Sequence, residues 1–199
     1  SISSDNLTFT YEAKSLPYPI DTSYYDNEKH TQADALSVIP FMDEMNYEGL
    51  SVSGLSDGYY GLTIGGEFIG RFTARELERG INMALLQNTP QYKQAMKIRQ
   101  MNEERWLKER KMREFYWVEY NLMRKTGMLW ACNEAAVDTL RKYRPHDIFL
   151  QWNGALWLQY MHKGIREDCV NEQQDLVNQI YEQNKPIPLR IEIKKFTDL

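Results

Sequence analysis

The sequence predicts an α+β fold, in which a small antiparallel sheet is combined with a long helix and further helices packed on it. Segments with the two-residue period of strands lie near both ends of the 199-residue chain, and a tight hairpin signal follows the first of them. Helix-start signals dominate the second half. This succession of strands, helices and a final strand is typical of α+β proteins. We therefore expect a mainly β region over residues 1–88 and a helical region with the closing strand over residues 89–199, together forming one compact unit.

The early part of the chain combines one clear strand with a segment that has no period. Residues 6–13 (NLTFTYEA) alternate apolar and polar side chains, which predicts a half-buried strand. Residues 14–34 predict a surface loop of about twenty residues, longer than most loops inside compact domains. Such a loop often belongs to a binding site or a contact surface. Residues 35–47 are ambiguous, because Pro40 argues against a continuous helix.

Residues 50–82 carry local signals that agree with one another. They begin with a short alternating segment, and Gly65-Gly66 can adopt the positive backbone angles that a tight hairpin turn requires. After the returning arm, Thr73 and Glu76 have the spacing of a capping box, in which each side chain accepts a hydrogen bond from the other residue's amide. This stretch predicts a hairpin followed by a short helix.

Helices and one strand are expected after residue 88. The first helix begins at Thr89-Pro90, a capping residue followed by proline, and extends to residue 126. At roughly 1.5 Å per residue it would reach about 55 Å. A compact chain of this length measures only about 40 to 45 Å across, so this helix must bend or overhang. Further helices are expected over residues 133–143 and 168–184, and a closing strand over residues 189–194.

The charge is unevenly distributed along the chain. The formal net charge is −4, with 28 acidic and 24 basic side chains. Residues 1–60 hold ten of the acidic side chains against Lys14 and Lys29, a balance of −8, so the remaining residues carry +4. This asymmetry fits either two parts of one protein that attract each other or a nucleic-acid surface on the basic side. We favour the first, because helices rich in both signs are usually solvated.

No complete catalytic or metal-binding motif is present in the sequence. Residues 54–58 (GLSDG) match the G-x-S-x-G pattern of a nucleophile elbow, but a strand and not a helix is predicted next, so we interpret them as a turn. His30, His146 and His162 are the three histidines, and none lies in a recognised motif. We expect no catalytic residue, no metal and no cofactor in this chain.

The two cysteines and the apolar segments exclude further classes. Cys132 and Cys169 lack a CxxC spacing, so they indicate neither a disulfide framework nor a zinc site. The sequence leaves two alternatives for these cysteines: a disulfide bridge between them, or two unpaired buried thiols. No apolar run approaches the roughly 18 residues of a membrane span, so we expect no membrane span.

The most aromatic part of the chain has the sequence FLQWNGALWLQY. Its residues Trp152, Asn153, Trp157 and Tyr160 are possible ligand-binding residues, because such side chains can form a platform for sugar rings. Tryptophans at helical spacing are more often core residues than binding residues, so a core role is the favoured alternative. Trp106 could stack on a base, but its acidic neighbours would repel phosphate, so we expect no nucleic-acid partner.

Several short blocks occur in a characteristic order. They are LPYPID (16–21), MNYEGL (45–50) with Val52 and Gly54-Leu55, GYYGLTIGG (58–66), GINMA (80–84) and TPQY (89–92). This succession resembles the C-terminal part of a group of SGNH (GDSL-type) hydrolases, which are bacterial esterases often associated with carbohydrate degradation. The resemblance covers residues 7–126 by order and spacing, and more loosely the rest.

The resemblance implies a role without chemistry of its own. In that family the catalytic serine lies in a Gly-Asp-Ser block near the start, the oxyanion-hole residues lie in later blocks, and the Asp and His of the triad come late in the catalytic domain. None of these blocks is present here, so no catalytic residue can be transferred. The resemblance implies an accessory region, either beside a catalytic domain of the same protein or as a freestanding relative. It also implies a secreted or periplasmic protein.

These observations lead to three hypotheses about function. The first is a non-catalytic C-terminal domain of an SGNH-type ester hydrolase, and this domain packs against a catalytic domain. The overhanging helix, the long loop and the uneven charge all fit such a contact surface. The second is a carbohydrate-binding module that uses Trp152 and Trp157. The third is a protein interaction domain that dimerises through an apolar helix face. The sequence leaves the substrate and the oligomeric state open.

Overall fold

The computed structural model describes residues 6–20, 24–25 and 30–196. The chain divides into two compact units, one formed by Ser1–Arg99 with Gln183–Leu199 and the other by Gln100–Glu182. We call them the sheet unit and the helical unit and describe each by itself. The predicted division after residue 88 falls where the long helix begins, whereas the two units divide within that helix.

The sheet unit contains short and long strands with a few helical turns. Its strands are β1 (Asn6–Tyr11), β2 (Tyr24–Tyr25), β3 (His30–Thr31), β4 (Gly49–Leu50), β5 (Tyr59–Ile64), β6 (Glu67–Thr73), β7 (Ile81–Asn82) and β8 (Leu189–Lys195). Its helical elements are the 3₁₀ turns η1 (Gln32–Ser37) and η2 (Met83–Leu85), the helices α1 (Phe41–Glu44) and α2 (Ala74–Arg79), and the first turns of α3 (Pro90–Val118).

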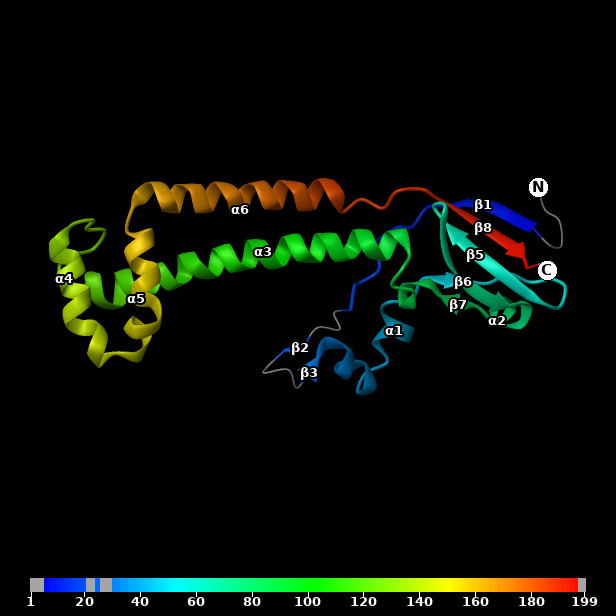
Figure 1. Ribbon diagram of the computed structural model, residues 1–199, viewed down its shortest axis with the longest axis horizontal. Helices are drawn as coiled ribbons and strands as arrows, with labels where there is room; N and C mark the ends of the chain where they lie inside the picture. The colour runs from blue at the N-terminus through cyan, green and yellow to red at the C-terminus, as the bar shows by residue number, and fades with distance from the viewer. Residues whose placement is uncertain (1–5, 21–23, 26–29, 197–199) are drawn as a thin grey trace. The chain divides into compact units, whose positions relative to one another are not determined.

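The long strands form one antiparallel sheet in the order β1-β8-β5-β6 (Figure 1). The last strand of the chain lies between the first strand and the hairpin, with Ile191 opposite both Phe9 and Ile64. Alternate side chains of β5 and β8 are fully buried and form the centre of the core with Leu77 of α2. The predicted α+β class and the predicted closing strand are therefore confirmed.

The hairpin and its helix follow the local sequence signals. Gly65 and Gly66 have φ angles of 59° and 86°, the region that residues with a side chain rarely adopt. The backbone amide of Thr73 donates to Glu76 Oε2 at 2.7 Å, and the Glu76 amide donates to Thr73 Oγ1 at 3.2 Å. The predicted capping box is therefore confirmed. Hydrogen bonds from Thr73 lower the pKa of Glu76 below its ordinary value of 4.5.

Two parts of the sheet unit differ from the prediction. The alternation of residues 50–53 predicted a strand, but strand β4 has only two residues and pairs with β7 in a separate sheet. It does not extend to Val52, whose amide donates to the carbonyl of Leu77 at 2.9 Å. In the segment predicted as a loop, β2 pairs with β3, and strands of two residues are too short to show a period. Residues 21–23 and 26–29 of that predicted loop lie outside the described part of the chain.

The helical unit follows the predicted order of helices. It contains the rest of α3, the π-helical turn η3 (Glu119–Met123), α4 (Glu134–Tyr143), the 3₁₀ turn η4 (Arg144–His146), α5 (Ile148–Tyr160) and nearly all of α6 (Lys163–Gln183). Asn133 caps α4 by accepting from the Ala136 amide at 3.0 Å, as predicted. Helix α6 begins at Lys163 rather than at residue 168, since nothing in the local sequence marks its start.

Helices α3 and α6 run side by side and antiparallel in the helical unit (Figure 1). Lys108 Nζ donates to Glu172 Oε2 at 2.6 Å, and the thiol of Cys169 donates to the Lys108 carbonyl at 3.7 Å.

Among the described residues, no helix combines the length and the apolar composition of a membrane span.

A buried carboxylate links three segments of the helical unit. Glu119, only 1% exposed, accepts at Oε1 from the indole Nε1 of Trp157 at 2.7 Å and at Oε2 from the backbone amide of Trp130 at 2.8 Å. The amide of Trp130 is held at a φ of 62°, an unusual angle for a residue with a side chain. Glu119 therefore joins η3, the loop before α4 and α5.

We expect Thr73→Ala to destabilise the sheet unit by about 1 kcal/mol, the usual contribution of a helix cap. Urea denaturation of the chain measures this change. Thr139→Ala is the matched control, because its hydroxyl donates only along α4, to the Ala135 carbonyl, and alanine favours a helix interior. Equal effects of the two substitutions would contradict the capping role.

Glu119→Gln keeps the shape of the side chain but gives it only one accepting oxygen for two donors. We expect the helical unit to lose about 1 to 3 kcal/mol, since one buried N–H group then lacks a partner. Thermal denaturation followed by tryptophan fluorescence measures the loss. Glu167→Gln, which removes an exposed ion pair with Lys163, should leave the transition unchanged. An unchanged thermal transition in Glu119→Gln would contradict a stabilising role of this carboxylate.

Candidate functional site

The structure places the predicted ligand-binding residues on different faces of α5. Trp157 is 0% exposed and Tyr160 is 8% exposed, whereas Trp152 is 66% exposed and Asn153 is half-buried. Besides the bond from Trp157 to Glu119, the hydroxyl of Tyr160 donates to Cys169 Sγ at 3.9 Å. Burial raises the pKa of Tyr160 to about 12. The four residues therefore do not form one exposed platform.

A different set of aromatic side chains, of which Phe149 and Trp152 are exposed and Trp117 is partly buried, packs together on the helical unit. Trp117 packs on Phe149 with ring centroids 5.2 Å apart, and Phe149 packs edge-on against Trp152 at 5.5 Å. We call Trp117, Phe149 and Trp152 the aromatic row. A groove of about 400 Å³ adjoins Trp117 and is also lined by Trp106 and Asn153. Sequence reasoning missed Trp117 and Phe149, because their contact joins two helices and leaves no local signal.

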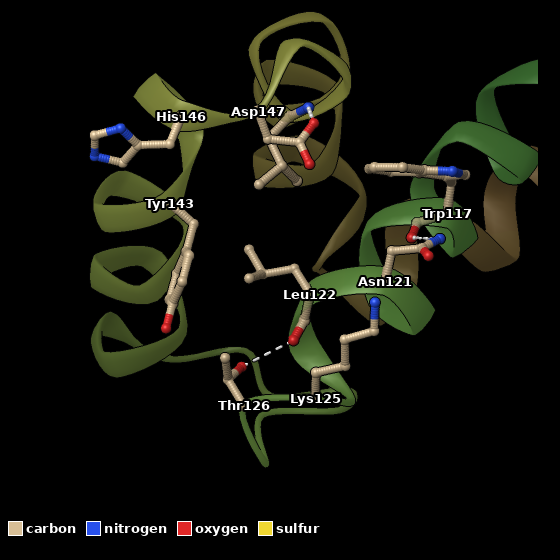
Figure 2. A pocket seen from close by; sticks show the side chains of 9 residues that line it. Trp117, Asn121, Leu122, Lys125, Thr126, Tyr143, His146 and Asp147 are labelled. Atoms are coloured by element: carbon tan, nitrogen blue, oxygen red, sulfur yellow. Dashed lines mark hydrogen bonds between the residues drawn. The ribbon is translucent and has the colours of Figure 1, made fainter.

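A second cavity of the helical unit, of about 350 Å³, is shown in Figure 2. It lies between the end of α3, the η3 turn and the segment that joins α4 to α5. Its polar lining side chains are Asn121, Lys125, Thr126, Tyr143, His146 and Asp147.

Three of these six polar side chains, Asn121, Thr126 and Asp147, form hydrogen bonds with the backbone. The Thr126 hydroxyl donates to the Leu122 carbonyl at 3.0 Å, and the Asp147 carboxylate caps α5 by accepting from the amides of Phe149 and Leu150. Figure 2 shows the imidazole of His146 pointing away from the other lining side chains. Although His146 and Asp147 are adjacent in sequence, they do not form an acid–base pair.

Ser56 lies in the connection between β4 and β5 and not before a helix. Its hydroxyl accepts from Lys195 Nζ at 2.6 Å and lies 3.1 Å from the hydroxyl of Tyr60. The Tyr60 hydroxyl also donates to the Ser56 carbonyl at 2.9 Å. These bonds fix the turn between the strands, and the strained strand-to-helix geometry of a nucleophile elbow is not formed.

The remaining candidates are the cysteines and the other histidine of the helical unit. Cys132 is exposed and Cys169 is buried, and both thiols are free, so the possible bridge between them is not formed. Cys132 Sγ lies 3.3 Å from His162 Nδ1. Across residues 6–20, 24–25 and 30–196, no three His, Cys, Asp or Glu side chains are placed to hold a metal ion together.

Asn82 of β7 connects several of the blocks that carry the family resemblance. Its Oδ1 accepts from the amides of Glu48 and Ala84, at 2.9 and 3.0 Å. Its Nδ2 donates to the carbonyls of Met42 and Asn46, at 2.8 and 3.0 Å. All four hydrogen-bonding positions of this amide are therefore used.

The same blocks also meet through other residues. Asn46 Oδ1 accepts from the Tyr18 amide at 2.8 Å, and Asn46 Nδ2 donates to the Tyr18 carbonyl at 2.9 Å. The Tyr92 hydroxyl donates to the Ile20 carbonyl at 2.8 Å. Residues that are up to 72 positions apart are thus fixed against one another.

A cavity of about 480 Å³ in the sheet unit is built on this network. Its lining includes Tyr11, Tyr18, Tyr47 and the carboxylate of Glu48. Burial raises the pKa of Glu48 above its ordinary 4.5, although hydrogen bonds from Gln91 and Tyr11 lower it in part. Burial and the neighbouring carboxylate of Glu48 raise the pKa of Tyr11 to about 12.

Gln91 approaches the same carboxylate from the first turn of α3. The residue is 2% exposed, and its Nε2 lies 3.3 Å from both carboxylate oxygens of Glu48. Its Oε1 is buried and has no partner among the described residues. The sequence could indicate these residues only through the resemblance, because their spacing matches no motif.

Comparison with known proteins relates the chain to one enzyme and one domain family. Residues 96–185 match the family model of the diltiazem deacetylase C-terminal helical domain. The structure matches that of BT4096, a gut microbial diltiazem-metabolizing enzyme, with a TM-score of 0.88 and 37% sequence identity. The match covers 96% of this chain and 43% of that enzyme, so the chain spans less than half of the enzyme's length. No curated protein matches the chain. The chain thus resembles a hydrolase-related C-terminal domain.

Asn82→Ala removes all four side-chain bonds of the network. We expect it to destabilise the sheet unit by about 2 kcal/mol or more, because buried carbonyl and amide groups lose their partners. Asn82→Asp keeps the accepting positions but turns a carboxylate oxygen toward the carbonyls of Met42 and Asn46, so we expect it to destabilise the unit at least as much. Asn178→Ala on the surface of α6 is the control. Urea denaturation orders the three variants, and an Asn82→Ala variant as stable as the control would contradict the bracing role of this amide.

Proposed function

We propose that the chain is a non-catalytic C-terminal accessory domain of an SGNH-type ester hydrolase, secreted or periplasmic, and that it packs against a catalytic domain of the same protein. The proposed reaction of the parent enzyme is the removal of an acyl group, such as acetyl, from an ester. The matched family model is named after a deacetylase, and the proposal extends that type of reaction to the parent enzyme of this chain.

The observation that carries the proposal is the extent of the structural match. A TM-score of 0.88 at 37% identity relates nearly the whole chain to less than half of a larger enzyme. The matched family model is itself a C-terminal domain. The SGNH assignment rests on the ordered blocks in residues 16–92, which resemble the part of SGNH hydrolases that follows the catalytic domain.

The chemistry of the described side chains supports the same proposal. Ser56 is bonded to a lysine and a tyrosine in a turn, and the cavity that contains His146 and Asp147 has no paired acid and base. The hydrolytic serine is therefore proposed to lie in the catalytic domain and not in this chain.

An esterase assay tests the proposal directly. The chain and its Ser56→Ala variant are incubated with p-nitrophenyl acetate and with acetylated sugars, and we expect both to match the rate of buffer alone. In the protein read from the coding sequence upstream of Ser1, we expect a Gly-Asp-Ser block whose serine is required for turnover. Turnover by the chain that Ser56→Ala abolishes would overturn the proposal.

A second candidate function is carbohydrate binding, and the aromatic row is the observation that favours it. Trp117, Phe149 and Trp152 present neighbouring ring faces and edges on one surface, and Asn153 lines the adjoining groove as a hydrogen-bonding group. Flat aromatic surfaces beside polar side chains suit the apolar faces and hydroxyls of sugar rings. This proposal replaces the pair Trp152 and Trp157 with a set of residues that lie on one surface.

Titration of tryptophan fluorescence with xylo- and cello-oligosaccharides tests the second candidate. We expect Trp152→Ala to weaken binding roughly tenfold, equivalent to about 1.4 kcal/mol. Tyr181→Ala is the matched control, since Tyr181 is an exposed aromatic residue of α6 away from the row. No spectral change with any of these sugars, or equal effects of the two variants, would count against carbohydrate binding at the row.

A further inference from the structure

We propose that the cavity between Tyr18, Tyr47 and Glu48 in the sheet unit is a binding site for an organic cation, whose ammonium or guanidinium group pairs with the carboxylate of Glu48. This inference stands apart from the proposed function, because it rests on side chains of the sheet unit alone.

The wall of the cavity that contains Tyr18 is held in place before any ligand arrives. Asn46 fixes the backbone of Tyr18 through two hydrogen bonds, and the Tyr18 ring packs edge-on against Phe41 with centroids 5.6 Å apart. Gln32 Nε2 donates to the Tyr18 hydroxyl at 2.9 Å. A wall with fixed backbone and fixed ring loses little conformational entropy when a ligand binds.

The opposite wall depends on a glycine. The ring of Tyr47 lies so close to Gly49 that a Cβ atom there would be 2.6 Å from Tyr47 Cε1. Only glycine permits this approach, although the Gly49 backbone angles themselves suit any residue. The sequence therefore places Tyr47 over the cavity by leaving Gly49 without a side chain.

The carboxylate between these walls is fixed and lacks a cationic partner. The backbone of Glu48 is bound on both sides, by Asn82 at its amide and by the Met83 amide at its carbonyl, 2.7 Å away. Among the described residues it forms no ion pair, and its donors are the neutral groups of Gln91 and Tyr11. A carboxylate accepts about four hydrogen bonds, so accepting positions remain.

The charge of the lining selects a cation over an anion. Besides Glu48, the charged groups that line the cavity are Glu12 and Lys14, so the carboxylates outnumber the ammonium. The tyrosine rings add the negative faces of their π systems, which attract ammonium and guanidinium groups. A partly buried carboxylate also gains more from a cation than an exposed one does, because water screens the pair less. An organic cation with a short apolar body meets all of these features.

Isothermal titration of the chain with benzylamine tests the proposal, with benzyl alcohol as the neutral counterpart. We expect the amine to bind at least tenfold more tightly than the alcohol, and Glu48→Gln to weaken amine binding roughly tenfold or more. Glu44→Gln, on the exposed end of α1, is the matched control and should bind as the unchanged chain does. Binding should also weaken as the pH falls through the raised pKa of Glu48, where protonation removes its charge.

Two further variants keep the test decisive if Glu48→Gln fails to fold. Tyr47→Ala removes an exposed ring, and Gly49→Ala displaces it, so both should weaken benzylamine binding without a change of charge. Equal binding of amine and alcohol, or binding that none of the three variants changes, would overturn the proposal. Nα-acetyl-lysine methylamide serves as a second probe. Tighter binding of this probe assigns the site to a lysine side chain of a protein, and tighter binding of benzylamine assigns it to a free amine.

Discussion

The amide of Asn82 satisfies backbone groups that no strand partner can reach. The chain from α1 to β4 is irregular, and irregular backbone still requires partners for its buried N–H and C=O groups. One side chain supplies four of these bonds, to Met42, Asn46, Glu48 and Ala84. These bonds fix the backbone of Glu48 and of Asn46, whose own side chain holds Tyr18, and they cap the η2 turn.

In the helical unit, a carboxylate and not an amide side chain provides hydrogen-bond partners for buried groups. Glu119 lies in a π-helical turn, a local irregularity that shifts the direction of side chains at the end of a helix. From there its two oxygens reach Trp157 and the amide of Trp130. A buried carboxylate is tolerated when its lone pairs are used, and leaving it without partners is costly. The indole N–H of Trp157 thus has a buried partner, which allows this side chain to pack fully in the core.

The sequence was informative where a structure depends on neighbouring residues. The hairpin at Gly65-Gly66, the capping box at Thr73 and the cap at Asn133 could all be predicted, because turn and cap chemistry is local. The partner of Trp157 could not be predicted, since it is 38 positions away, and helical spacing favours a core without excluding a platform. The aromatic row and the Glu48 cavity were missed for the same reason: each is assembled from residues that only the fold brings together.

The two lines of resemblance overlap along the chain but rest mainly on different units. The ordered blocks of residues 16–92 lie in the sheet unit, and they include Asn46, Glu48 and Asn82, which are joined by hydrogen bonds. The matched family model, over residues 96–185, covers the helical unit, which is built mainly by the packing of apolar side chains between helices. The structural match spans both units. Sequence blocks and a family model can therefore point to different parts of one scaffold.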